Sequence, residues 1–156
     1  MRVLYHLQFS PFSRKVRLSL AEKKLEFEPR LEDVWHPREE YLALNPAGQV
    51  PVLVDDASTI ADSTAIVEYL EEVCPSPSLI GRSPAVRAEA RRLSFWFDLK
   101  FFEEVTKPIL EEKVFKRFMA MGQPKTEIIR VAKKNISYHL EYISWLVERR
   151  NWLVGD

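Results

Sequence analysis

The sequence predicts an α/β module over residues 1–75, followed after a short linker by an all-helical segment over residues 84–156. Two observations lead to this prediction. In the first half the hydrophobic pattern changes from short β-rich runs to helical spacing and back, whereas the second half keeps helical spacing. Between the halves, prolines interrupt residues 76–83, which is typical of a connector between domains.

Composition and charge are those of a globular protein without a strong long-range field. The chain has 156 residues, of which 46% are hydrophobic and 29% charged, and its 23 basic and 23 acidic side chains cancel. A neutral chain does not attract nucleic acid or an anionic membrane at long range, so we expect neither as a partner. With the single cysteine, Cys74, and no apolar run long enough to cross a bilayer, we expect a cytoplasmic protein.

The first module begins with a predicted βαβ unit. A β-rich run over residues 3–7 indicates a buried strand, and helical spacing from Ser13 to Lys24 follows it. Alternation over residues 25–31 indicates a second strand. Proline cannot donate to a strand ladder, so Pro29 places this strand at an edge of the sheet.

A ββα unit is predicted to complete the module. Residues 33–45 lack a long period and indicate a loop with one short helix. Strands at residues 50–54 and around Ile60 form a hairpin, and Asp62 or Ser63 then caps a helix that ends before Pro75.

Two long helices are expected in the second half. Ser83 caps the first, which begins at Pro84, is expected to bend near Pro108 and can continue to Met121. The second begins at Thr126. Its residues predicted to face inward are Ile129, Ala132, Ile136, Leu140, Ile143 and Val147.

Ser10 places a hydroxyl between the first strand and the first helix. The N–H groups and the dipole at a helix start favour an anion, and a hydrogen bond from a hydroxyl favours a thiolate over a thiol. A serine followed by proline is also a common start of a turn. Taken alone, Ser10 therefore leaves a catalytic and a structural interpretation open.

Two further positions also have two interpretations. Pro51 either simply starts a strand, or the Val50–Pro51 bond is cis and turns the main chain of Val50 outward to pair with a peptide-like ligand. Asp62 and Ser63 cap a helix, and N–H groups at that same helix start can bind a ligand carboxylate.

The order of these segments resembles the N-terminal domain of cytosolic glutathione transferases. The segments are Ser10-Pro11-Phe12, Asn45-Pro46-Ala47-Gly48-Gln49-Val50-Pro51-Val52-Leu53 and Ile60-Ala61-Asp62-Ser63-Thr64-Ala65-Ile66. The first of them, with the downstream Val16-Arg17 and Glu22-Lys23, is most similar to the tau, zeta and omega classes, where a serine or cysteine meets the glutathione sulfur. The resemblance implies a thioredoxin-like domain, a partial transferase helical domain, and an enzyme that conjugates its co-substrate glutathione to an electrophile.

The resemblance also implies a role for individual residues. Ser10 would stabilise the thiolate, with Tyr5 and Ser13 as alternative hydroxyls, and disulfide exchange is not expected because serine cannot form the mixed disulfide. In glutathione binding, the main chain of Val50 would pair with the cysteinyl part, next to a cis Pro51. Asp62 and Ser63 would bind the γ-glutamyl end. Gln49 and Lys24 are the weaker candidates for the glycyl carboxylate. The acceptor pocket would use Phe12, Trp96 and Phe97.

A second set of segments is similar to a bacterial subgroup of transferase-like proteins, which includes cell-division regulators that bind the tubulin-like filament protein FtsZ. These segments are Phe95–Phe101, Glu112–Val114 and Tyr138–Ile143. The alternative function is therefore a non-catalytic protein-binding module. Trp35, in a polar loop, is the candidate contact because aromatic residues dominate interface hot spots, although it can equally cover the sheet edge.

The family resemblance also bears on assembly and on the chain end. It implies a homodimer. The final segment, 152–156, is similar to one that leads into a further buried helix, so we expect a C-terminally truncated chain with an exposed hydrophobic patch. The three histidines, His6, His36 and His139, lie on separate expected elements without a second ligand at metal spacing, so no metal site is expected.

Overall fold

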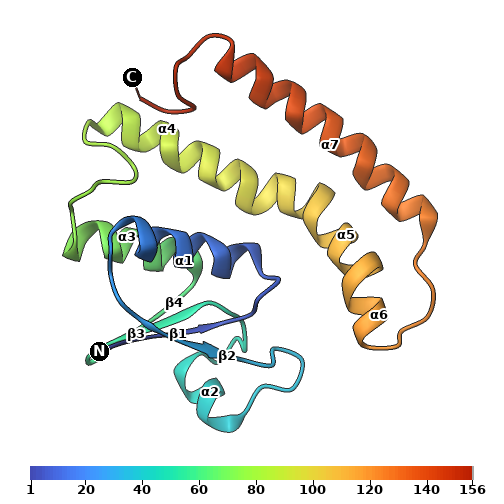
Figure 1. Ribbon diagram of the computed structural model, residues 1–156, viewed down its shortest axis with the longest axis horizontal. Coiled ribbons are helices and arrows are strands. Elements are labelled where there is room, and N and C mark those ends of the chain that lie inside the picture. The colour runs from blue at the N-terminus through green and yellow to red at the C-terminus, as the bar shows by residue number, and fades with distance from the viewer. Residues whose placement is uncertain (156) are drawn as a thin grey trace. The chain divides into compact units, whose positions relative to one another are not determined.

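The structure, a computed structural model, describes residues 1–155. The chain divides into two units, with the boundary between Leu79 and Ile80, inside the predicted linker (Figure 1). Among the helices of the described part, none combines the length and hydrophobicity that a membrane crossing requires.

The first unit is built on a thioredoxin-like sheet of four strands, as predicted. The strands are β1 (Arg2–His6), β2 (Glu28–Leu31), β3 (Val52–Asp55) and β4 (Ser58–Ala61), in the order β2-β1-β3-β4. β1 pairs parallel with β2 and antiparallel with β3, and β3 pairs antiparallel with β4. Pro29 lies in the edge strand β2, where its missing N–H leaves the ladder to β1 intact.

Helices α1 (Pro11–Glu22) and α3 (Ser63–Val73) cover one face of this sheet, and the short α2 (Glu39–Leu44) lies on the opposite side (Figure 1). Apolar residues from the sheet and from α1 and α3 form the core between them. They are Leu4, Val16, Leu20, Leu53, Ile66 and Leu70, all fully buried. Because alternate residues of a strand face opposite sides, Leu4 and Leu53 point toward the helices while their neighbours point toward the side of α2.

The second unit begins with a nearly continuous helical run that changes its hydrogen-bonding pattern. It comprises α4 (Pro84–Phe95), the π-helical η1 (Trp96–Thr106), α5 (Lys107–Leu110), the π-helical η2 (Glu111–Phe115) and α6 (Lys116–Phe118). Pro108 falls in the first turn of α5, where Figure 1 shows the run bending, as expected. The π-helical segments were not predicted, because the spacing of apolar side chains does not reveal which carbonyl each N–H reaches.

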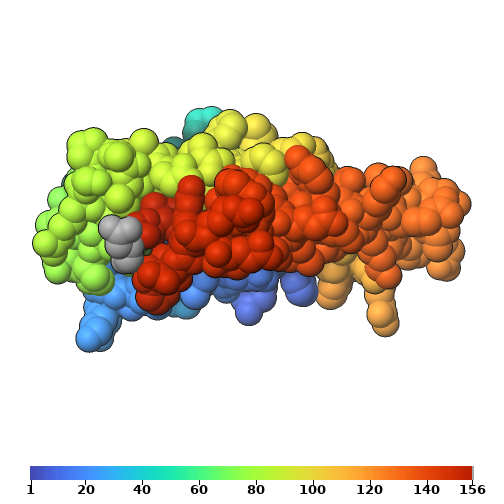
Figure 2. Space-filling model, turned by 90° about the horizontal axis from the view of Figure 1, so that it is seen from above, coloured from blue at the N-terminus to red at the C-terminus, as the bar shows by residue number. Residues whose placement is uncertain are grey.

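α7 (Thr126–Val147) returns along this run and lies at the surface over its whole length (Figure 2). Its buried line consists of Ala132, His139 and Leu146. The prediction that Leu140 and Val147 face inward is wrong, since they are 53% and 49% exposed. Apolar residues occur on more than one side of α7, so the hydrophobic pattern does not identify the buried face. A pattern based on apolar residues also does not predict that a histidine is buried.

A buried ion pair joins the ends of α1 and α3. Lys23 Nζ lies 2.7 Å from Glu71 Oε1, and the two side chains are 0% and 2% exposed. Lys23 also donates to the carbonyl oxygens of Cys74 (2.7 Å) and Pro77 (2.8 Å). Glu71 in turn accepts from the Ser78 hydroxyl and from the Leu79 N–H, each at 2.9 Å. The pair therefore also fixes the chain that follows α3.

The surroundings of Glu71 determine how this pair responds to pH. Burial acts to raise the pKa of Glu71, but the hydrogen bonds from Lys23, the Leu79 N–H and Ser78 outweigh it, so the pKa lies below that of an ordinary glutamate. A carboxyl with a depressed pKa stabilises the fold above its unfolded-state pKa. That contribution is lost as the pH falls through the folded-state value.

We expect Lys23→Ala to lower the free energy of unfolding by about 3 kcal/mol, because it leaves the Glu71 carboxylate buried without its counter-charge. Urea denaturation at neutral pH measures this loss. Lys24→Ala is the matched control, since Lys24 is the neighbouring lysine and is exposed, and it should change stability by less than about 0.5 kcal/mol. Equal losses in the two variants would contradict the role of the ion pair.

Candidate functional site

Ser10 is the N-cap of α1, directly after the end of β1. Its Oγ accepts a hydrogen bond from the Ser13 N–H at 3.1 Å. A hydroxyl carries one proton and two lone pairs, and the cap uses only a lone pair. The Ser10 proton therefore stays available to donate to a group placed beside the start of the helix.

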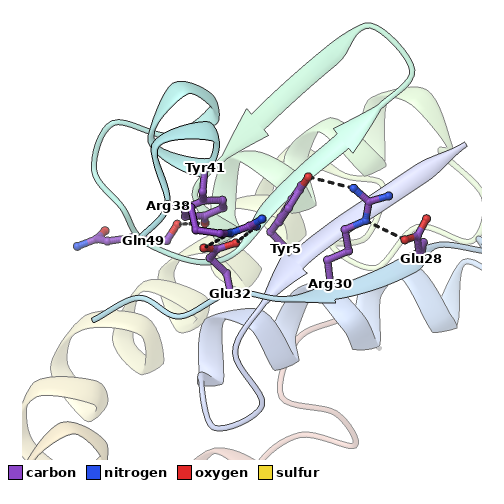
Figure 3. Close-up of polar contacts among 7 residues, drawn as sticks. All are labelled: Tyr5, Glu28, Arg30, Glu32, Arg38, Tyr41 and Gln49. Carbon is purple, nitrogen blue, oxygen red and sulfur yellow. Dashed lines mark hydrogen bonds and ion pairs between the residues drawn. The ribbon is translucent and has the colours of Figure 1, made fainter. Parts of the chain in front are cut away.

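The two alternative hydroxyls are less suited to this task. Ser13 is fully buried, and its Oγ accepts from the Leu7 N–H at 3.4 Å. Tyr5 points to the other side of the sheet, where its Oη accepts from Arg30 at 3.3 Å (Figure 3). Ser10 is half-buried, so of the three serine and tyrosine candidates it combines exposure with a free proton at a helix start.

The Val50–Pro51 bond is cis, as the resemblance implies. Both residues precede β3, and Pro51 is buried while Val50 is half-buried. Within residues 1–155, the hydrogen bonds of the structure leave the main-chain N–H of Val50 unused. A free main-chain donor at the head of a strand is the feature that pairing with an extended peptide requires.

Asp62 is the N-cap of α3 and has a positive φ of 76°. Its Oδ1 accepts from the N–H groups of Thr64 (2.7 Å) and Ala65 (3.1 Å). These N–H groups are thus already satisfied. Ser63, the first residue of α3, is 4% exposed, and its role in binding a ligand carboxylate stays a prediction. The exposed Asp62 carboxylate retains further lone pairs, which can accept from an ammonium group.

Gln49 has an exposed side chain but a main-chain oxygen that is firmly held. The oxygen accepts from Tyr41 Oη at 2.6 Å and from Asn45 Nδ2 at 2.8 Å. Figure 3 shows the Gln49 amide pointing away from Tyr41. The sequence patterns predict no role for Tyr41 or Asn45. Their positions one helical turn apart, directly ahead of Gln49, are the signal that could have suggested one.

Lys24 is removed from the candidate site. It follows the C-terminal end of α1, whereas Ser10 caps the N-terminal end. A helix rises 1.5 Å per residue, so α1 separates the two positions by about 18 Å. The predicted contact of Lys24 with the same ligand is not supported.

The three predicted acceptor-pocket residues belong to different units. Phe12 lies in the first turn of α1, and Trp96 and Phe97 begin η1. Trp96 donates its indole N–H to His139 Nδ1 at 3.0 Å, so it can offer a ligand only its ring. The ring of Phe97 lies 5.8 Å from that of Phe101. An acceptor pocket that joins all three stays a prediction.

The bond from Trp96 also defines the state of His139. Because Nδ1 accepts from Trp96, the imidazole proton is on Nε2 and is donated to Glu104 Oε2 at 3.0 Å. The hydrogen bond from Lys100, followed by that from His139, holds the pKa of Glu104 below its usual value. His139 is thus a satisfied core residue. In the described part of the chain, no group of three His, Cys, Asp or Glu side chains is placed to hold a metal.

Trp35 lies in the loop between β2 and α2 and is 40% exposed. Its main-chain N–H donates to Asp33 Oδ1 at 3.0 Å, which fixes the turn that carries it. A partly exposed indole on an ordered turn is compatible with a contact to another protein. That role stays a prediction.

Comparisons with known proteins agree with this architecture. Residues 9–73 match the family model of the glutathione S-transferase N-terminal domain. The chain is 43% identical to FtsZ-localized protein A of Caulobacter vibrioides (strain NA1000 / CB15N) over 158 residues, which covers 99% of this chain and 69% of that protein. It is 29% identical to maleylacetoacetate isomerase of Pseudomonas aeruginosa PAO1, covering 98% of this chain and 73% of that protein.

Among solved structures, a glutathione S-transferase from Rhodospirillum rubrum F11 superposes with a TM-score of 0.97 at 54% identity. The match covers all of this chain and 71% of that one. The similarity to these proteins extends over nearly the whole of this chain. It therefore includes the four-stranded sheet, the capped starts of α1 and α3 and the cis proline before β3. The chain belongs to the glutathione S-transferase family.

Proposed function

We propose that the first unit binds glutathione and that the protein conjugates it to a small electrophile. The observation that carries the proposal is the Ser10 hydroxyl, which caps α1 through a lone pair and keeps its proton free. A thiolate placed beside it receives one hydrogen bond and the field of the helix start.

These interactions act on the thiol of the bound tripeptide. Its proton leaves to solvent, and the Ser10 O–H donates to the resulting thiolate. The sulfur then forms a bond to the electrophilic carbon, and the leaving group on that carbon departs with the bonding electron pair. Lowering the thiol pKa by roughly two units from about 8.5 requires ~2.7 kcal/mol of preference for the thiolate. One charge-assisted hydrogen bond of about 1.5–3 kcal/mol, together with the helix dipole, is sufficient.

The remaining positions hold the two ends of glutathione in this proposal. The main chain of Val50, next to the cis Pro51, pairs with the cysteinyl part. At the start of α3, Asp62 accepts from the γ-glutamyl ammonium group and Ser63 donates to its carboxylate. The exposed amide of Gln49 is the donor for the glycyl carboxylate.

The acceptor and the assembly complete the proposal. The acceptor residues of this proposal are those that the family resemblance implies, Phe12, Trp96 and Phe97. Trp96 can offer an apolar electrophile its ring, because its indole N–H is already used. We infer a homodimer in the cytoplasm from membership of the family. Retention of the protein on immobilised glutathione tests the binding step directly.

We expect Ser10→Ala to lower the rate of conjugation at pH 7 by roughly tenfold or more, because the thiol returns toward its free pKa of about 8.5. Stopped-flow absorbance of the bound thiolate against pH measures that pKa. Ser83→Ala is the matched control, since Ser83 also caps a helix that begins with proline and accepts from the Val86 N–H at 3.3 Å.

Both variants should lose about 1 kcal/mol of stability with the cap. Only Ser10→Ala should change the thiol pKa. If both leave it unchanged while wild-type protein conjugates glutathione, another group activates the sulfur.

A second candidate function is binding to a protein partner without catalysis. It is favoured by the 43% identity to FtsZ-localized protein A, whose name associates that protein with FtsZ. In this proposal the fold is a platform, and the partner is an FtsZ-like filament protein. Trp35 is the proposed anchor, because it is exposed on an ordered turn of the first unit.

We expect Trp35→Ala to weaken co-sedimentation with FtsZ filaments by about tenfold or more, the effect of removing a hot-spot aromatic residue. Trp152→Ala, which truncates another exposed tryptophan, is the control and should bind as wild type does. The proposed anchor is refuted if the two variants bind alike. Glutathione affinity measured in parallel shows whether the two functions use separate surfaces.

A further inference from the structure

The main-chain oxygen of Gln49 is an unusual acceptor, because two side chains of the same unit donate to it. Tyr41, in α2, donates its phenolic proton at 2.6 Å, and Asn45 donates from Nδ2 at 2.8 Å (Figure 3). Both donors are buried, at 1% and 8% exposure. The oxygen is therefore directed inward, although Gln49 itself is exposed.

The direction of this oxygen also determines the direction of the Val50 N–H. The Gln49 carbonyl and the Val50 N–H belong to one planar peptide unit. In residues 1–155 the cis bonds are Val50–Pro51 and Ser76–Pro77, so the Gln49–Val50 bond is trans. In a trans unit the oxygen and the N–H hydrogen point in opposite directions. Holding the oxygen against Tyr41 and Asn45 therefore turns the Val50 N–H away from them.

Asn45 is itself fixed by three further hydrogen bonds. Its Oδ1 accepts from the Ala47 N–H at 3.2 Å, which defines the orientation of its amide. Its N–H donates to the Tyr41 carbonyl at 2.9 Å, and its carbonyl accepts from Gly48 at 2.9 Å. Gly48 has a φ of +64°, so the turn requires a residue that tolerates the left-handed conformation.

Tyr41 is a permanent donor. Its ring packs 5.5 Å from that of Tyr5. Burial, with a smaller effect of the Glu32 charge, raises the pKa of Tyr41 to about 12, so the phenol keeps its proton at any physiological pH. Two donors on one carbonyl also polarise the peptide unit, which makes its N–H a stronger donor.

We propose that Tyr41 and Asn45 are positioning residues that direct the Val50 N–H toward the cysteinyl part of glutathione. The inference rests on the proposed function for the identity of the ligand. Neither side chain contacts the ligand in this arrangement, and both act through the peptide unit between Gln49 and Val50. They fix the direction of the Val50 N–H before the ligand binds. In a flexible loop, this N–H would have to be ordered on binding, at a cost in affinity.

The test compares Tyr41→Phe with Tyr5→Phe in the full chain. Each variant removes one phenolic hydroxyl from the same pair of rings, but the Tyr5 hydroxyl accepts from Arg30 and does not contact Gln49. The residual dipolar coupling of the Val50 N–H, measured without ligand, reports its direction. We expect Tyr41→Phe to change this coupling and to raise the dissociation constant for reduced glutathione about fivefold, the effect of one hydrogen bond.

Tyr5→Phe should leave both quantities unchanged. In steady-state kinetics, Tyr41→Phe should raise KM for glutathione while kcat at saturating glutathione stays the same. If Tyr41→Phe matches wild type in coupling and affinity, the inference is overturned and glutathione binding stands. If the coupling changes only in Tyr41→Phe but wild type does not bind glutathione, the positioning role is supported and the proposed function fails.

A second variant covers the case in which Tyr41→Phe does not fold by circular dichroism. Asn45→Asp keeps the oxygen that accepts from the Ala47 N–H and replaces the donor to Gln49 by a carboxylate oxygen. We expect a changed Val50 coupling and a glutathione dissociation constant raised at least fivefold. Wild-type values for both would overturn the inference.

Discussion

The first unit depends on the buried ion pair between Lys23 and Glu71. The pair joins the C-terminal ends of α1 and α3, the two helices whose N-terminal ends present Ser10 and Ser63. Both side chains are buried, and their hydrogen-bond partners lie at the end of α1, in α3 or in residues 74–79. If one helix shifted relative to the other, a buried charge would therefore lose its partner. The positions of the two helix starts on the sheet are thus fixed from their opposite ends.

The candidate site uses main-chain groups and helix caps more than reactive side chains. In the proposed site, Ser10 supplies one hydroxyl and Val50 supplies an N–H group whose direction follows from the backbone. A site of this kind requires an accurate backbone and few specific side chains. Relatives with names as different as an isomerase and an FtsZ-localized protein are similar to this chain, and one fold can in general carry sites with different functions.

The second unit shows a polar network where the sequence pattern indicated only apolar packing. His139 lies fully buried between the Trp96 indole and the Glu104 carboxylate, and each of its ring nitrogens has a partner. A buried imidazole with both nitrogens satisfied costs little, so it can replace an apolar residue on the inner line of α7. The apolar residues of α7 that remain at the surface, among them Leu140 and Val147, then lie outside this core.

The sequence by itself determined the order of strands and helices, the edge position of β2, the cap of α4 and the choice of Asp62 or Ser63 as the cap of α3. These features follow from local signals, because a proline, a serine or aspartate cap and a hydrophobic period act within a few residues. Only the tertiary structure decided that Lys23 meets Glu71, that Tyr41 and Asn45 hold the Gln49 oxygen, and that His139 rather than Leu140 is buried. Lys23 and Glu71 are far apart in the chain, whereas Tyr41 and Asn45 lie eight and four residues from Gln49. All of these contacts follow from the need to satisfy buried polar groups in three dimensions.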